Sequence, residues 1–242
     1  MGDVAKKVVL SSLGSLVKKW ESREVSIPAY EIPAPPERSV VYFYDVPGAK
    51  QSVLMFGYPC MSVDDPDFYP ATVMNYILGG GGFASRLTQQ LRQEKGYTYG
   101  IRSSFSGSTI PGPFTISSGV QTNVTLEATS LIHDIMKSYP EDYSDEDLQV
   151  TKGFLIRSNA RAFETMGAKL NMLQDISEFG WPYDYVKDRE EIVRDMTVDH
   201  IRSLAAKYAD PGKMIYLIVG DAATQLERLN QLGYGEAVLI NK

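Results

Sequence analysis

Residues 78–99 read LGGGGFASRLTQQLRQEKGYTY, in which four consecutive glycines, Gly79 to Gly82, precede a helical stretch that stops at Gly96. Glycine runs before helices often bind phosphate, since the backbone can approach an anion closely. A Walker-type loop requires G-x-x-x-x-G-K-[ST], but here Phe83–Ala84–Ser85–Arg86 follows the glycines and the lysine is missing.

The looser dinucleotide pattern G-x-G-x-x-G/A is matched by Gly79, Gly81 and Ala84. That pattern requires a preceding strand and an acidic residue about 20 positions further on. Residues 66–78 have a helical pattern instead, and Arg102–Ser103–Ser104–Phe105 occupies the downstream region. We therefore interpret Gly79, Gly80, Gly81 and Gly82 as a flexible joint, or hinge loop, between two helices, where glycine permits positive φ and close backbone approach.

The pattern of apolar residues predicts strands first and helices later. The segments 39–46 and 51–60 are β-branched and aromatic and flank Pro47–Gly48, which favours a hairpin. Asp65–Pro66–Asp67 favours a helix start, and Ser144 with Asp147 resembles a capping box. Further strands are expected at 97–106, 114–121, 214–220 and 237–240, and helices at 84–95, 124–136, 144–163, 165–179, 183–194, 198–209 and 224–232.

This order of elements predicts an α+β fold, with a mostly antiparallel sheet and helices packed on one face. An amphipathic helix with apolar positions from Val4 to Trp20 precedes it, followed by the proline-rich segment IPAYEIPAPPE at 27–37. Proline fixes φ and removes a donor, so this segment is expected to be an extended connector.

The charge and the cysteine content exclude several kinds of partner and site. The net charge of −6 and the pI near 5.1 favour neither nucleic acid nor an anionic membrane as a partner. Cys60 is the lone cysteine, which excludes an intramolecular disulfide and a cysteine-rich zinc site. No apolar stretch approaches the roughly 20 residues of a membrane helix, and no signal peptide is visible, although a missing front end could carry one. The compartment, cytoplasmic or periplasmic, stays open.

A Gly-Asp pair opens both the first and the last amphipathic stretch, at Gly2–Asp3 and at Gly220–Asp221. Chance accounts for such a pair equally well, because Gly-Asp is a common helix entry. If the match is a true repeat, residues 1–23 are the end of a preceding homologous domain. In that case 24–38 is a linker, and 39–242 is the second half of a duplicated protein.

The segment from Asp65 to Tyr99 resembles the C-terminal, non-catalytic half of the pitrilysin (insulinase) family of zinc metallopeptidases, which includes the mitochondrial processing peptidase. The matching stretches are DPDFYPATVMNYILGGGGFASRL and LRQEKGYTYG, with Arg92 seven residues before Tyr99. The likeness extends to VYFYDVPGAKQS at 41–52 and to IVGDA at 218–222. The two halves of that family are similar domains joined by a linker.

The catalytic half of that family carries H-x-x-E-H, in which two histidines on one helix bind zinc and the glutamate activates its water. This chain has two histidines, His133 and His200, and neither context holds the motif. The resemblance thus implies no zinc in this chain, a zinc-bearing catalytic half as partner, and no peptidase activity by this chain alone.

The resemblance implies that Arg92 and Tyr99 contact the backbone of a peptide substrate. Arg92 would lie in the last turn of a helix that Gly96 ends, and Tyr99 would begin the next strand. A guanidinium and a phenol O–H suit a carbonyl oxygen that gains negative charge during attack by water. Without the resemblance, a solvated helix-end cation and a strand aromatic would be the favoured interpretation. Arg86 either shapes the chamber wall together with the glycines or is a surface charge.

The function expected from these residues is substrate binding by the zinc-free half of a metallopeptidase. One alternative is a non-enzymatic scaffold subunit, as in the respiratory-complex relatives of this family. Another is a separate non-catalytic subunit that pairs with a zinc-bearing one. The helix and connector at 1–38 favour one continuous polypeptide.

Overall fold

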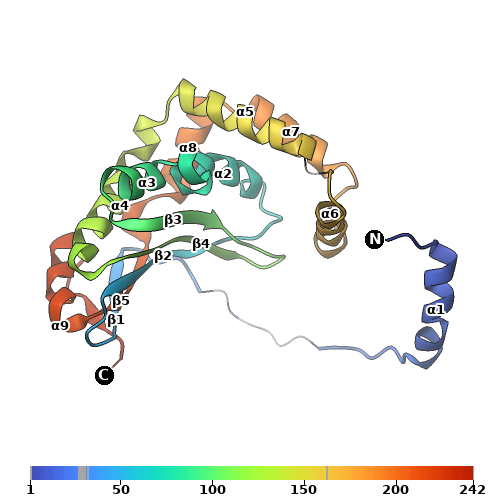
Figure 1. The fold of residues 1–242 in the computed structure, drawn as a ribbon, viewed down its shortest axis with the longest axis horizontal. Helices are drawn as coiled ribbons and strands as arrows, with labels where there is room; N and C mark the ends of the chain where they lie inside the picture. The colour runs from blue at the N-terminus through green and yellow to red at the C-terminus, as the bar shows by residue number, and fades with distance from the viewer. Residues whose placement is uncertain (1, 27–30, 32, 162, 242) are drawn as a thin grey trace.

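The computed structural model of the chain describes residues 2–26, 31, 33–161 and 163–241, and within these ranges six strands form one sheet (Figure 1). The strand order is β3-β4-β2-β5-β1-β6, and three of the five neighbouring pairs are antiparallel. The strands are β1 Val40–Asp45, β2 Gln51–Met61, β3 Thr98–Phe105, β4 Gly112–Gln121, β5 Ile215–Gly220 and β6 Val238–Leu239.

Helices cover one face of this sheet, with α2, α4 and α8 next to it and α5 and α7 beyond them (Figure 1). This confirms the predicted α+β class. The helices are α1 Lys6–Lys19, α2 Phe68–Asn75, α3 Arg86–Thr88, α4 Thr125–Asp142, α5 Asp145–Arg161, α6 Met166–Phe179, α7 Tyr185–Asp195, α8 Val198–Tyr208 and α9 Ala222–Gln225. Two π-helical turns, η1 Tyr76–Gly80 and η3 Gln89–Glu94, flank the 3₁₀ turn η2 Gly82–Ala84, and further 3₁₀ turns occupy Thr122–Val124, Pro211–Lys213 and Glu227–Leu232.

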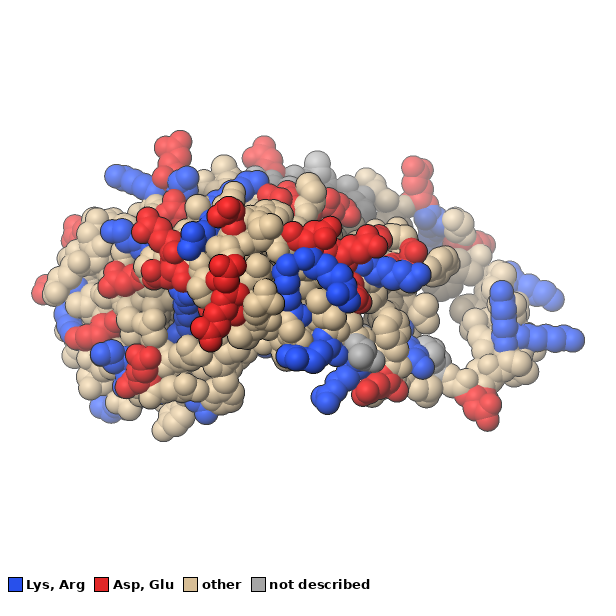
Figure 2. All heavy atoms as spheres, turned by 90° about the horizontal axis from the view of Figure 1, so that it is seen from above, with Lys and Arg blue, Asp and Glu red and all other residues tan. Residues whose placement is uncertain are grey.

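Alternation along the strands gives the sheet one buried and one open face. In β2, Leu54 and Phe56 are fully buried under the helices, whereas Val53 and Met55 face the other way and are about half exposed. On the open face, the three strands β2, β4 and β5 carry no charged residue. The helical side, by contrast, carries acidic and basic side chains interspersed with one another (Figure 2).

The predicted hairpin of the first two strands is wrong, because β5 lies between β1 and β2. It pairs with β1 in parallel and with β2 in antiparallel orientation. The link between β1 and β2 passes over the end of β5, where Val46 N–H donates to the Gly220 carbonyl at 2.6 Å. Gly48 N–H donates to the Asp221 carboxylate at 3.1 Å. The apolar β5 fits this buried central place, which sequence periodicity could not assign because β5 comes about 150 residues later.

Several helix boundaries also differ from the sequence expectation. The helix expected at 84–95 is an α-helical turn that continues as the π-helical turn η3, and the one expected at 224–232 is α9 followed by a 3₁₀ turn. The carboxylate of Asp65 accepts from Asp67 N–H at 2.8 Å in a turn, and α2 begins only at Phe68. The capping box is confirmed, since Ser144 and Asp147 exchange side-chain and backbone hydrogen bonds.

Asp67 joins the start of α2 to the end of α8. Its Oδ2 accepts from the Lys207 ammonium and the Tyr208 hydroxyl, each at 2.8 Å. These two hydrogen bonds, that from Lys207 first, hold the pKa of Asp67 below its ordinary value. The carboxylate therefore stabilises the fold above the unfolded-state pKa of about 3.9, and this contribution is lost as the pH falls through the lower folded-state pKa.

We expect Asp67→Asn to lower the free energy of unfolding by about 1 kcal/mol at about pH 7, a modest loss because the Lys207 side chain is 62% exposed. The difference between the two proteins should begin to shrink below about pH 4, where the carboxylate of the unfolded chain takes up its proton, and should vanish once the pH is below the lower folded-state pKa. Urea unfolding of both proteins across this pH range measures it. An equal loss at every pH would contradict the assignment.

The amphipathic helix α1 stands apart from the rest of the chain (Figure 1). No residue of α1 is buried, and its apolar positions, Leu10, Leu13 and Val17 among them, are exposed. No helix within the described ranges is both long and apolar enough to cross a membrane.

Candidate functional site

Arg92 and Tyr99 line one hollow of about 330 Å³ at the edge of the sheet where β3, β4 and the start of β2 meet. Of the described residues that line it, Arg92 alone is charged. The others are Gln51, Gly96, Tyr97, Thr98, Tyr99, Gly119, Val120 and Gln121. Gln51 and Gln121 are direct cross-strand partners on β2 and β4, so their two amides lie beside each other on the open face.

Arg92 projects from the last turn of η3, next to the fully buried Leu91. The turn ends as predicted, because Gly96 adopts the left-handed conformation with φ of 64°. Tyr97 N–H then donates to the Leu91 carbonyl at 2.9 Å, which closes the helix end. Within the described residues, Arg92 makes no ion pair and no side-chain hydrogen bond. Its guanidinium N–H groups are therefore available to a ligand.

A bulge at the start of β3 turns Tyr99 outward, where it is 88% exposed. The pairing with β4 shifts between Thr98 and Ile101, so two residues oppose one on β4. The Thr98 hydroxyl donates to the Gly119 carbonyl at 2.7 Å and accepts from Gly100 N–H at 3.0 Å. This buried hydroxyl replaces the interrupted ladder and fixes the direction of Tyr99.

The glycine run is a tightly packed joint between η1 and η2. A Cβ on Gly79 would lie 2.8 Å from Leu87 Cδ1 and 2.9 Å from Ser103 Cβ, and closer still to the Ser103 hydroxyl. A Cβ on Gly80 would lie 2.9 Å from the amide nitrogen of Asn75. These two glycines are required because buried side chains press against the backbone, and not because the joint is mobile.

The second pair of glycines serves the turn itself. Gly81 N–H donates to the Tyr76 carbonyl at 2.7 Å, and a Cβ on Gly81 would lie 2.6 Å from that oxygen. Gly82 has φ of 58°, the left-handed region that favours glycine. The chain thereby reverses into η2 and presents Phe83, which is 61% exposed.

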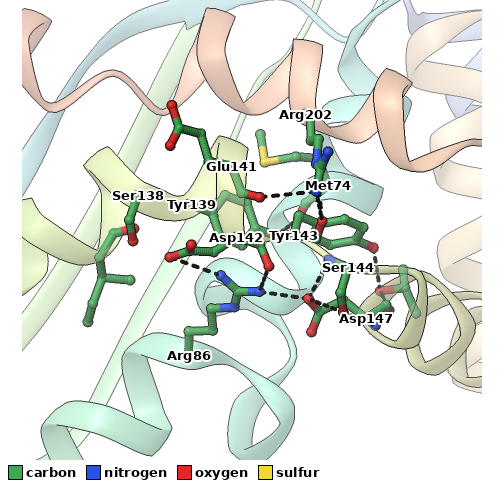
Figure 3. Close-up of polar contacts among 12 residues, drawn as sticks. Met74, Arg86, Ser138, Tyr139, Glu141, Asp142, Tyr143, Ser144, Asp147 and Arg202 are labelled. Carbon is green, nitrogen blue, oxygen red and sulfur yellow. Dashed lines mark hydrogen bonds and ion pairs between the residues drawn. The ribbon is translucent and has the colours of Figure 1, made fainter.

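Arg86 does not line the hollow and is neither free nor fully solvated (Figure 3). Its Nη2 donates to the Asp142 carbonyl and to Asp147 Oδ2, each at 2.7 Å. The guanidinium also lies over the Tyr139 ring, at 5.2 Å from its centroid. Arg86 thus anchors the turn that follows the glycines to the junction of α4 and α5.

The two histidines lie on different helices, His133 on α4 and His200 on α8. His133 Nδ1 lies 3.0 Å from the carboxylate of its neighbour Asp134. Across the part of the chain that the structure describes, no group of three or more His, Cys, Asp or Glu side chains could hold a metal ion. These residues do not fit a catalytic zinc site.

Sequence reasoning missed Phe83 and Thr98 as parts of the site. The ring of Phe83 lies against the Arg92 guanidinium, with 4.8 Å between the Arg92 Cζ and the ring centroid. A signal for Thr98 was present, because Gly100 interrupts the strand pattern and an isolated glycine in a strand often marks a bulge. Phe83 carried no such signal in the sequence.

Comparison with known proteins places this chain in a family. The family described as "Peptidase M16 inactive domain" matches residues 1–154. Among curated proteins, the chain is 26% identical over 178 residues to "Non-peptidase homolog YmxG" of Helicobacter pylori, covering 71% of this chain and 40% of that protein. It is 27% identical over 165 residues to "Uncharacterized zinc protease SCO5738" of Streptomyces coelicolor, covering 64% and 34%. The chain thus spans less than half the length of these relatives.

The fold agrees with the same family. The crystal structure of a peptidase M16 inactive domain from Pseudomonas fluorescens superposes with a TM-score of 0.75 at 25% identity, over 91% of this chain and 52% of that one. These findings confirm the resemblance that the glycine run and the Arg92…Tyr99 spacing indicated. The chain belongs to the peptidase M16 inactive domain family.

Proposed function

We propose that this domain binds extended peptide substrates opposite a zinc-bearing catalytic half, and that Arg92 and Tyr99 donate hydrogen bonds to the substrate backbone. The observation that carries this proposal is that both side chains line one hollow whose other described lining residues are uncharged. A lone cation with free N–H groups, beside a phenol and two amides, suits a neutral but strongly polar group such as a peptide carbonyl.

The packing around the site supports a binding role, since the two donors are held by rigid elements. A bulge fixed by buried hydroxyls directs Tyr99, and a closed helix end directs Arg92. Donors that are held in place before the ligand arrives lose little entropy when it binds.

The test uses the chain itself and a fluorescein-labelled, unstructured 20-residue peptide, roughly the length of chain that an interface of ordinary size contacts. We expect Arg92→Ala to weaken binding about tenfold, the effect of losing about one charge-assisted hydrogen bond. Tyr99→Phe should weaken it less. Arg102→Ala is the matched control, because Arg102 is an exposed arginine of β3, the strand that carries Tyr99, and lies outside the hollow. Native affinity in both Arg92→Ala and Tyr99→Phe would refute the proposal.

The domain arrangement is part of the same proposal, with residues 1–23 as the last helix of a preceding domain and 24–38 as its linker. The exposed apolar positions of α1 support it, since an amphipathic helix is stable when its apolar face is covered. Sequencing the gene upstream of the Met1 codon tests this. An open frame of about two hundred residues with H-x-x-E-H would support one polypeptide, in keeping with ordinary domain sizes. A true start at Met1 would favour a separate subunit.

A non-peptidase role is the second candidate, and it is favoured by the name of the Helicobacter pylori relative, "Non-peptidase homolog YmxG". A scaffold subunit has no need for an arginine and a tyrosine that share a hollow. An upstream domain in which H-x-x-E-H is degraded, together with unchanged peptide binding by the Arg92 variant, would favour this candidate over the first.

A further inference from the structure

We propose that Phe83 is a positioning residue for Arg92, and that the left-handed turn at Gly82 places its ring there. This inference rests on the proposed function, because it assigns Phe83 a role in presenting the Arg92 guanidinium to a peptide. The direct observation is that the Arg92 Cζ lies over the Phe83 ring, 4.8 Å from its centroid.

Phe83 is an apolar side chain that remains 61% exposed at the tip of a turn. Its backbone, in contrast, is firmly held. Gln89 Nε2 donates to the Phe83 carbonyl at 3.3 Å, and the Ser85 hydroxyl donates to the Gly82 carbonyl at 2.7 Å. The turn therefore holds an exposed ring in a defined place, where the Arg92 cation lies over it.

The contact with the ring leaves the hydrogen-bonding groups of the guanidinium without an oxygen acceptor. Arginine has five N–H donors, and within the described residues Arg92 donates none of them to another side chain and forms no ion pair. In an arginine that is held by a carboxylate, some of those N–H donors are already hydrogen-bonded. A ring can therefore restrict the rotamers of Arg92 and still leave its donors available to a peptide carbonyl.

Arg86 provides the comparison within the same loop. It follows the glycine run by a few residues, and its Nη2 is engaged by the Asp142 carbonyl and the Asp147 carboxylate. Two arginines thus follow the run. Arg86 donates to oxygen acceptors that fix the turn, whereas the contact recorded for Arg92 among the described side chains is the Phe83 ring. Because their partners differ, we infer a structural role for Arg86 and a ligand-binding role for Arg92.

Phe83→Leu keeps an apolar side chain but removes the ring, and Phe83→Trp keeps a ring. We expect Phe83→Leu to weaken binding of the labelled 20-residue peptide about fourfold, and Phe83→Trp to bind within a factor of about two of the native chain. In an Arg92→Ala background, Phe83→Leu should have no further effect, because Phe83 acts through Arg92. Phe163→Leu, at an exposed phenylalanine outside the hollow, is the matched control.

Side-chain NMR of the native chain gives a readout that does not depend on peptide binding. Ring currents from Phe83 should shift the Arg92 Hδ and Hε resonances, and Phe83→Leu should abolish that shift while Phe83→Trp retains one. Absence of the shift in the native chain would overturn the inference, as would an equal effect of Phe83→Leu with and without Arg92. If instead the shift is present and Arg92→Ala binds normally, the proposed function fails and the contact is only structural.

Discussion

Gly79→Ala should lower the free energy of unfolding by about 3–4 kcal/mol, the sum of overpacking a filled core and disturbing a buried hydrogen bond. The new methyl group would press on Leu87 and Ser103, which are 0% and 1% exposed. Ser103 cannot turn away without cost, because its hydroxyl donates to the amide oxygen of Asn75, which is itself buried. Thermal unfolding should show a fall in Tm of about 10 °C for a chain of this size.

Substitutions at two other glycines distinguish the causes of the stability loss expected for Gly79→Ala. Gly82→Ala meets no atom within 4 Å, but its φ of 58° should cost about 1 kcal/mol. Gly167 of α6 also has open space and no positive φ, so Gly167→Ala should stabilise the chain slightly by raising helix propensity. If Gly79→Ala cost no more than Gly82→Ala, the joint would be loosely packed and its glycines would serve flexibility.

The glycine run shows how far sequence reasoning extends. The missing lysine and the helical pattern before Gly79 excluded a phosphate site, and both the joint and the left-handed Gly96 were predictable from local rules. The requirement for Gly79 was not, because Ser103 and Leu87 come from other elements. Local patterns identify which positions need glycine for a turn, whereas close approach depends on tertiary packing.

For the sheet too, some features follow from local sequence patterns and others depend on tertiary packing. Composition and alternation located all six strands, but the pairing of β1 with β5 depends on residues far apart in the chain. Arg92 and Tyr99 were candidate site residues because of the family resemblance, and their side chains line one hollow. Phe83 could not be predicted as part of the site, because a phenylalanine beside glycines has no distinctive sequence pattern. Its contact with Arg92 depends on how η2 and η3 pack against each other in the fold.

The largest functional effect is expected from Arg92→Ala in the proposed assembly of this domain with a zinc-bearing catalytic half. The kcat/KM for cleavage of an unstructured peptide should fall about 10³-fold, because one donor to a developing oxyanion contributes about 10²-fold in kcat. The remaining factor of about ten should appear in KM, as it does in the binding of the peptide by this chain alone. Arg92→Lys should recover little, since an ammonium lacks the planar donors and stacks less well on Phe83.

The division between kcat and KM distinguishes the possible roles of Arg92. A change confined to KM would mean that Arg92 only holds the substrate in its ground state. A parallel loss in kcat means that the guanidinium contacts the carbonyl oxygen more strongly as charge develops on it. Arg102→Ala should leave both constants unchanged, because Arg102 lies outside the hollow. Native kinetics in the Arg92→Ala enzyme would remove the residue from the reaction and leave the scaffold role as the better account.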